Sequence, residues 1–168
     1  MSPIVWPVWR QLPAPVRMIG RWLTIVQVAG YTVSLIYVWH TTRLVPGGIA
    51  DHYRGSEGLD GAMQFPKSLG ELLTITHTHL FSMLVIFVLS GLCVTLCERV
   101  TERMKRVLVT EPFVALLVSM SAIWLTRYVH SGFGLLLQLS SLLMAGTFYL
   151  QSWLVLAELG FWERGTTG

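Results

Sequence analysis

Residues 72–97 read LLTITHTHLFSMLVIFVLSGLCVTLC and carry no charged side chain. An α-helix rises 1.5 Å per residue, so about twenty apolar residues are enough to cross the roughly 30 Å hydrocarbon core of a bilayer. Backbone N–H and C=O groups cannot stay unpaired in lipid, and a helix pairs them within the segment itself. The stretch therefore predicts a helix that spans a membrane.

Three further segments have the length and apolar composition of membrane spans. They cover residues 22–42, 111–128 and 133–159, and Pro112 lies at the entry of its span, where a helix tolerates proline. Of the 168 residues, 53% are hydrophobic and 12% are charged, and this charged fraction is about half of that in a soluble domain. The sequence thus predicts an all-α, integral membrane four-helix bundle and argues against a water-soluble enzyme.

The chain reads as a single membrane domain over residues 1–168 with a lead-in at residues 1–21. In the lead-in, Trp6, Trp9 and Leu12 are spaced by three, which predicts a short stretch at the membrane interface; a disordered lead-in is the alternative. No continuous apolar run or small-residue cleavage site is present there, so the lead-in does not resemble a cleaved signal peptide.

Lysine and arginine are distributed unevenly between the two sides of the predicted bundle. With the N-terminus inside, eight lie in inner segments and four in outer segments. The positive-inside rule then places both termini in the cytoplasm of a bacterial-type inner membrane and makes residues 43–70 a long periplasmic loop. Where that loop ends, Ser68 and Glu71 have the spacing of a capping box, which predicts a helix start.

Several function classes are excluded by what the sequence lacks. It has no basic stripe, zinc-ligand spacing or glycine-rich phosphate loop, so a nucleic-acid or nucleotide partner is not expected. No histidine–aspartate pair is placed to activate a serine, so the chain is not expected to be an enzyme by itself. Cys93 and Cys97 lie four residues apart on one helical face, and we interpret them as structural thiols.

The histidines carry the most informative signal. Four of them, in three different predicted helices, fall at one membrane level near the outer surface, and a fifth, His52, lies in the loop; the four are His40, His77, His79 and His130. Ionisable groups at membrane depth are costly and usually face the bundle interior or a cavity. The cluster predicts a cofactor or metal site, with interface histidines that hold no ligand as the alternative.

Two imidazoles from different helices are a usual means of holding a b-type haem in a membrane bundle. We expect His79 and His130 to ligate the haem iron, with His40 and His77 as second choices. His77 points about 200° away from His79 around a regular helix, so the two cannot share one slot. Nearby arginines at the outer level are candidates to pair with the haem carboxylates; they are Arg127 and Arg43, the latter more readily reaching lipid headgroups.

The same residues could instead form a metal-ion site. Neutral imidazoles suit a zinc or copper ion, and His77 and His79 could bind one together with Glu71 and His52 from the loop. An ion or proton pathway has little support, because no acidic series crosses the membrane and Glu111 and Glu158 are expected near the inner helix ends.

Small or polar positions indicate which helix faces should turn inward. We expect the inward face of the second span to hold His79, Ser82, Met83, Ile86, Ser90 and Cys93. For the third span the expected residues are Ser119, Ile123, Thr126 and His130. For the first span they are Val26, Gly30, Val33, Tyr37 and His40, and for the fourth they are Ser141, Ala145 and Phe148.

The four spans with His40, His77, His79 and His130 near one face resemble the small four-helix membrane cytochrome b subunits. The resemblance implies electron exchange near the outer surface with a quinone or a periplasmic c-type cytochrome, within an oxidoreductase complex. The sequence departs from that family in having no second histidine pair near the opposite face. The alternative is an accessory subunit without its own cofactor, which binds other membrane subunits of a respiratory or photosynthetic complex.

Overall fold

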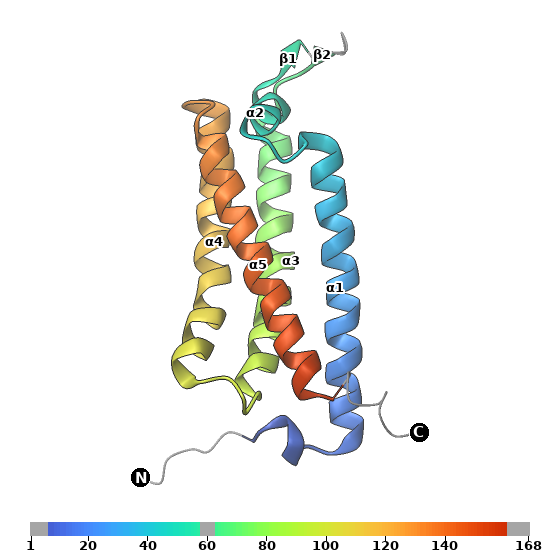
Figure 1. Ribbon diagram of the computed structural model, residues 1–168. Helices are drawn as coiled ribbons and strands as arrows, with labels where there is room; N and C mark the ends of the chain where they lie inside the picture. Colours follow the sequence, from blue (N-terminus) through green and yellow to red (C-terminus); the bar gives the residue numbers. More distant parts are fainter. Residues whose placement is uncertain (1–6, 58–62, 161–168) are drawn as a thin grey trace.

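The computed structural model describes residues 7–57 and 63–160. Helices dominate it, and the elements follow one another along the chain as drawn in Figure 1. They are the 3-10 turn η1 (Trp9–Gln11), α1 (Ala14–Thr42), α2 (Pro46–Arg54), strands β1 (Ser56–Glu57) and β2 (Met63–Gln64), α3 (Leu69–Thr95), α4 (Glu102–Tyr128) and α5 (Phe133–Glu158).

Four of these helices, α1, α3, α4 and α5, are long and apolar enough to cross a membrane. They run up and down, so that α1 begins and α5 ends at the same end of the bundle, which we name the terminal end (Figure 1). The opposite end, the loop end, carries α2 and the antiparallel pair β1–β2. The predicted all-α membrane four-helix bundle is confirmed, while the side of the membrane on which each end lies stays a prediction.

Three spanning helices begin earlier than the apolar runs predict. Helix α1 starts at Ala14 rather than at residue 22, α3 at Leu69 rather than 72, and α4 at Glu102 rather than 111. The N-cap of α4 is Thr101, whose side chain accepts a hydrogen bond from the Met104 N–H over 3.4 Å. Charged residues such as those after Thr101 form helix as readily as apolar ones, so hydropathy marks the span and not the helix start.

Pro112 consequently lies inside α4, and its prediction as an entry residue is wrong. A proline within a helix has no N–H to donate to the carbonyl four residues earlier. That carbonyl belongs to Leu108, and it accepts a hydrogen bond from Gln151 Nε2 of α5 over 2.6 Å. The glutamine side chain, fully buried, therefore supplies the donor that the proline lacks.

The lead-in packs into the bundle. Trp9 is only 3% exposed, its indole N–H donates to the Cys93 carbonyl over 2.9 Å, and its ring lies against Gly20. The Trp9 side chain therefore packs within the chain, the interfacial position of the lead-in stays a prediction, and Trp6 lies outside the described residues. Cys93 and Cys97 are buried free thiols in the same cluster, and burial raises the pKa of Cys97 to about 12.

The predicted inward faces hold for three helices and fail for α1. Ser90, Cys93, Ser119, Ile123, Thr126 and Ala145 are buried, whereas Ser82 and His130 are exposed. On α1 the predicted face, with Val26, Gly30, Val33, Tyr37 and His40, is exposed. The buried positions of α1 include Thr24 and Thr42, whose hydroxyls donate to their own helix at Gly20 and Val38. A threonine whose hydroxyl is hydrogen-bonded within its own helix can face either the protein core or lipid.

We expect Gln151→Met to lower the free energy of unfolding by about 1–3 kcal/mol, because the Leu108 carbonyl loses its donor in an apolar interior. Pro112→Ala restores the backbone N–H, so the same Gln151→Met change should be much less damaging in a Pro112→Ala background. Denaturant titration of the four variants in detergent, followed by circular dichroism, measures this coupling. Equal losses in both backgrounds would show that the hydrogen bond does not substitute for the missing N–H.

Candidate functional site

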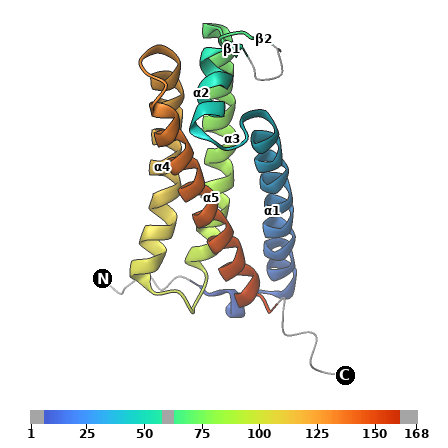
Figure 2. The ribbon, with the colours of Figure 1, turned by 45° about the horizontal axis from the view of Figure 1, so that its top comes forward.

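The long loop between the first two spans contains regular secondary structure, namely α2 and the strand pair β1–β2. Helix α2 packs across the loop end of α4 and α5, where Ile49 and Ala50 are buried. Close contact is possible because Gly134, near the start of α5, has no side chain; a Cβ there would lie 2.8 Å from the Pro46 carbonyl oxygen. Figure 2 shows α2 and the strand pair together at this end, beside the start of α3.

Two arginines attach this loop to its surroundings. Arg54 Nη1 donates to the Thr126 carbonyl over 3.0 Å, and Arg127 Nε donates to the Lys67 carbonyl over 2.9 Å. The Arg127 guanidinium also lies 5.1 Å from the centre of the Tyr128 ring. Arg127, a predicted haem-carboxylate partner, thus has a structural role in holding the loop, while Arg43 is exposed at the left-handed C-cap of α1.

The start of α3 is the predicted capping box. Ser68 Oγ accepts from the Glu71 N–H over 3.3 Å, and Glu71 Oε2 accepts from the Ser68 N–H over 2.8 Å. Lys67 Nζ lies 3.2 Å from Glu71 Oε1. The first turn of α3 is therefore held in place, with a charged pair at the loop end.

A cleft of about 900 Å³ lies between α1, α2 and the first three turns of α3. We name it the loop-end cleft. Its polar and aromatic lining comes from the loop as well as from the spans, and apolar Val33, Val38 and Ile75 complete it. The polar and aromatic residues are Ser34, Tyr37, Thr41, Thr42, His52, Tyr53, Lys67, Glu71, Thr74 and His79.

His79 is half-buried in this cleft, and its ring is oriented by its own helix. Its Nδ1 lies 2.8 Å from the Ile75 carbonyl oxygen. Because a carbonyl only accepts, Nδ1 carries a proton, and in the neutral ring Nε2 keeps its lone pair. A backbone carbonyl at the second ring nitrogen is the usual orientation of a histidine that binds iron or another metal through Nε2.

His52, from α2, is the second histidine that lines the cleft. Its ring lies edge-on to that of Tyr53, with 5.1 Å between centres. Burial lowers the pKa of His52 below its usual 6.5, and the Lys67 charge acts in the same direction against the opposing effect of Glu71. Burial also raises the pKa of Tyr53 to about 12. The lining of the cleft therefore includes a neutral imidazole and a protonated phenol in addition to His79.

The other three predicted histidines do not line the cleft. His40 and His77 are exposed, and the His77 ring lies 4.9 Å from that of Phe81. His130 is exposed in the turn between α4 and α5, where its Nδ1 accepts the Gly132 N–H over 2.9 Å. That bond places the proton of a neutral His130 ring on Nε2, the opposite arrangement from His79.

The predicted ligand pair, His79 and His130, is not brought together. The register of α3 and α4 is given by Trp124 Nε1, which donates to Thr76 Oγ1 over 2.9 Å. From that level His79 is three residues nearer the terminal end, and His130 is six residues nearer the loop end. At 1.5 Å per residue the two histidines are separated by roughly 10 Å or more along the bundle. His79 instead shares the lining of the loop-end cleft with His52.

Within residues 7–57 and 63–160, no three histidine, cysteine, aspartate or glutamate side chains form a group that could hold a metal ion. A haem differs, because its macrocycle supplies most of the iron ligands and the protein adds one or two axial ones.

The sequence identified His79, and it named His52 and Glu71 as loop contributors. It gave no sign of Tyr53 and Lys67, because only the fold of the loop brings them to α3.

The fold and the cleft define a multi-pass membrane protein with four apolar spanning helices and a structured loop at one end. The chain belongs to a family of transmembrane helical domains, whose match covers residues 43–166 and so includes α2, α3, α4 and α5. No curated protein and no solved structure matches the chain.

The lowered pKa of His52 predicts a dependence of stability on pH. The unfolded chain binds a proton at this histidine more readily than the folded chain does. The contribution of neutral His52 should therefore be present above about pH 6.5 and be lost as the pH falls through the lower folded-state value. Histidine resonances in NMR spectra, assigned by comparison with His52→Gln, measure the titration. A His52 pKa above 6.5 would contradict the burial argument.

Proposed function

We propose that the chain is a membrane electron-transfer subunit that holds a b-type haem in the loop-end cleft, with His79 as an axial ligand. The observation that carries the proposal is the hydrogen bond from His79 Nδ1 to the Ile75 carbonyl, which leaves Nε2 available. The cleft volume of about 900 Å³ lies within the range of small-molecule and cofactor sites.

Three features of the cleft support this assignment. His52 is neutral and half-buried in the lining of the same cleft, so its imidazole is available to a cofactor bound there. Lys67 also lines the cleft and offers a cation for a haem carboxylate, although Glu71 now occupies it as an ion-pair partner. Apolar side chains of α1 and α3 complete the wall beside these polar groups.

The position of the cleft decides what such a cofactor would do. A bound haem supplies one-electron chemistry, and the residues of the chain orient it and set its surroundings. All five histidines lie in the loop-end half of the chain's helices and loop. The proposal is therefore electron exchange at the loop-end surface, with a quinone or a periplasmic c-type cytochrome as partner, and not transfer across the whole membrane.

The test is the reduced-minus-oxidised absorption spectrum of the purified chain, with extracted haem quantified. We expect haem in the wild type, its loss in His79→Ala, and its retention in His77→Ala, which changes an exposed histidine two residues away on the same helix. His130→Ala should also retain haem. Full haem content in His79→Ala would refute the ligand assignment, and a wild-type chain without haem after expression with adequate haem supply would refute the function.

A second candidate function is that of an accessory subunit, and the exposed face of α1 favours it. Gly30 and Ser34 lie four residues apart on this face, and no atom lies within 4 Å of a Cβ built at Gly30. Small residues at this spacing let two membrane helices approach closely. The face with Gly30 and Ser34 is therefore suited to a helix of another membrane subunit.

Gly30→Leu tests this candidate, with Gly146→Leu as its control because a Cβ at Gly146 also meets no neighbouring atom. If α1 docks onto another subunit, Gly30→Leu should abolish recovery of partner chains in gentle detergent, and Gly146→Leu should leave it unchanged. Unchanged recovery with both variants would exclude this face as the docking surface. Haem content of Gly30→Leu, measured in parallel, separates this role from the haem site.

A further inference from the structure

Glu111 lies within the spanning part of α4, and its prediction near a helix end is wrong. Because α4 begins at Glu102, nine residues of helix precede Glu111. The last basic residue before the span is Arg106, and Glu111 lies roughly 7 Å beyond it along the helix. Its carboxyl group is thus placed among apolar residues of the bundle rather than at the water boundary.

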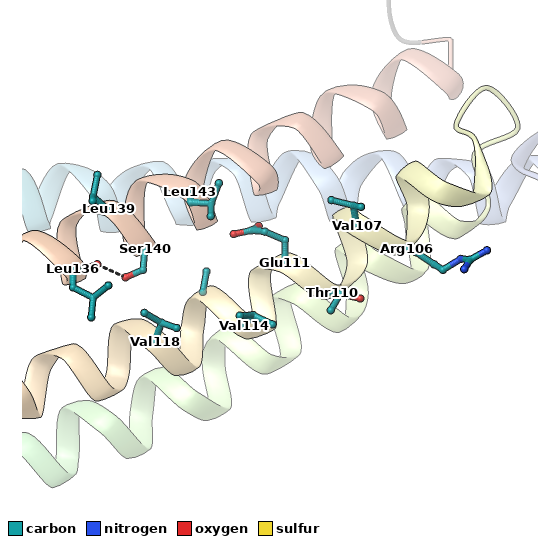
Figure 3. Close-up of a pocket in the computed structure, with 11 residues that line it drawn as sticks. Arg106, Val107, Thr110, Glu111, Val114, Val118, Leu136, Leu139, Ser140 and Leu143 are labelled. Atoms are coloured by element: carbon teal, nitrogen blue, oxygen red, sulfur yellow. Dashed lines mark hydrogen bonds between the residues drawn. The ribbon is translucent and has the colours of Figure 1, made fainter.

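The surroundings of Glu111 provide no hydrogen-bond donor, among the described residues, that would offset the cost of burying its carboxyl group. It lines a groove of about 690 Å³ between α4 and α5, and its side chain extends from α4 towards α5 (Figure 3). The groove wall is mostly aliphatic and includes Val107, Val114, Val118, Leu136, Leu139 and Leu143. Among the residues placed by the structure, neither Glu111 oxygen has a hydrogen-bond partner, and both are buried. An unpaired carboxylate is costly there, so the group requires a proton or a donor.

Two more buried acceptors continue from Glu111 towards the terminal end. Gln151 is fully buried, and while its Nε2 donates to Leu108, one turn from Glu111, its Oε1 has no partner in the described part of the chain. Glu158 follows two turns later on α5, with a side chain that is 1% exposed. Its oxygens lie 3.9 Å from Arg10 and 3.8 Å from Arg99, distances of ion pairs rather than hydrogen bonds.

The charged and titratable groups around Glu111 come from several helices. Arg106 of α4 lines the groove, and α1 contributes Tyr31, whose ring packs against Phe148 and Tyr149 of α5. Helix α5 contributes Glu158 at its end, and the one charged residue of α3, Glu71, is at the opposite end of the bundle. Towards the terminal end the polar side chains that follow Glu111 are Gln151 and Glu158, and towards the loop end Ser140 lines the same groove and pairs with Ser119.

We propose that Glu111 is a proton-binding carboxyl within the membrane, which exchanges its proton with the terminal-end side through Gln151 and Glu158. In the binding step an O–H bond forms on the Glu111 carboxylate, and the proton comes from the aqueous phase at that end. The site is separate from the loop-end cleft, and it stands whether or not the cleft holds a haem.

Dicyclohexylcarbodiimide is the probe, because this apolar reagent adds to protonated carboxyls that lie in a membrane. The chain in lipid vesicles is treated over a range of pH, and the adduct is located by peptide mass spectrometry. We expect an adduct on Glu111 that declines as the pH rises and disappears in Glu111→Gln. Glu102→Gln, which removes an exposed carboxylate paired with Lys105, should leave the adduct unchanged. No adduct on Glu111, or an adduct independent of pH, would overturn the proposal.

The route is tested by vesicles in which the chain has one orientation and the two aqueous phases have different pH. Labelling of Glu111 should follow the pH at the terminal end, and Glu158→Gln should weaken that response. Labelling that follows the pH at the loop end would overturn the route through Gln151. Protection by sodium ions at constant pH would identify a metal-cation site and overturn the assignment to a proton.

Discussion

The hydrogen bond between the Gln151 side chain and the Leu108 carbonyl fixes α5 against α4 at the place where proline interrupts the backbone pairing of α4. A bilayer supplies no water to that carbonyl, so the donor has to come from a neighbouring helix. Helices α4 and α5 form the most extensive helix contact of the bundle, and α3 and α2 pack onto this pair. Helix α1 joins mainly through α5 and stays exposed along one side.

The same need for internal partners accounts for most other polar side chains in the spans. Hydroxyl groups such as those of Thr24 and Ser152 donate to the carbonyl four residues earlier, and Ser119 and Ser140 pair with each other across α4 and α5 over 2.8 Å. The His79 ring follows this rule at one nitrogen and leaves the other for the cleft. Glu111 departs from the rule, and a membrane carboxyl of that kind is characteristic of a functional site.

Much of the architecture could be read from hydropathy and local motifs. The four spans, the capping box at Ser68 and the concentration of histidines at one end all follow from composition and spacing within short segments. The start of α4 could not be read in this way, because the charged turns before Glu111 are helical without being apolar. The inward face of α1 could not be predicted from the sequence either. A threonine whose hydroxyl donates to its own backbone packs equally well against the protein core or against lipid.

By itself the sequence determined that this chain crosses a membrane four times and that its histidines gather at one end, because both properties depend on residue type and order. Only the tertiary structure decided which of these groups meet. It placed His79 and His52 in the lining of one cleft, which His130 does not share, because the loop folds into α2 and is held to α4 by Arg54. Contacts of this kind depend on helix register and loop path, which are set by packing between segments distant in the chain.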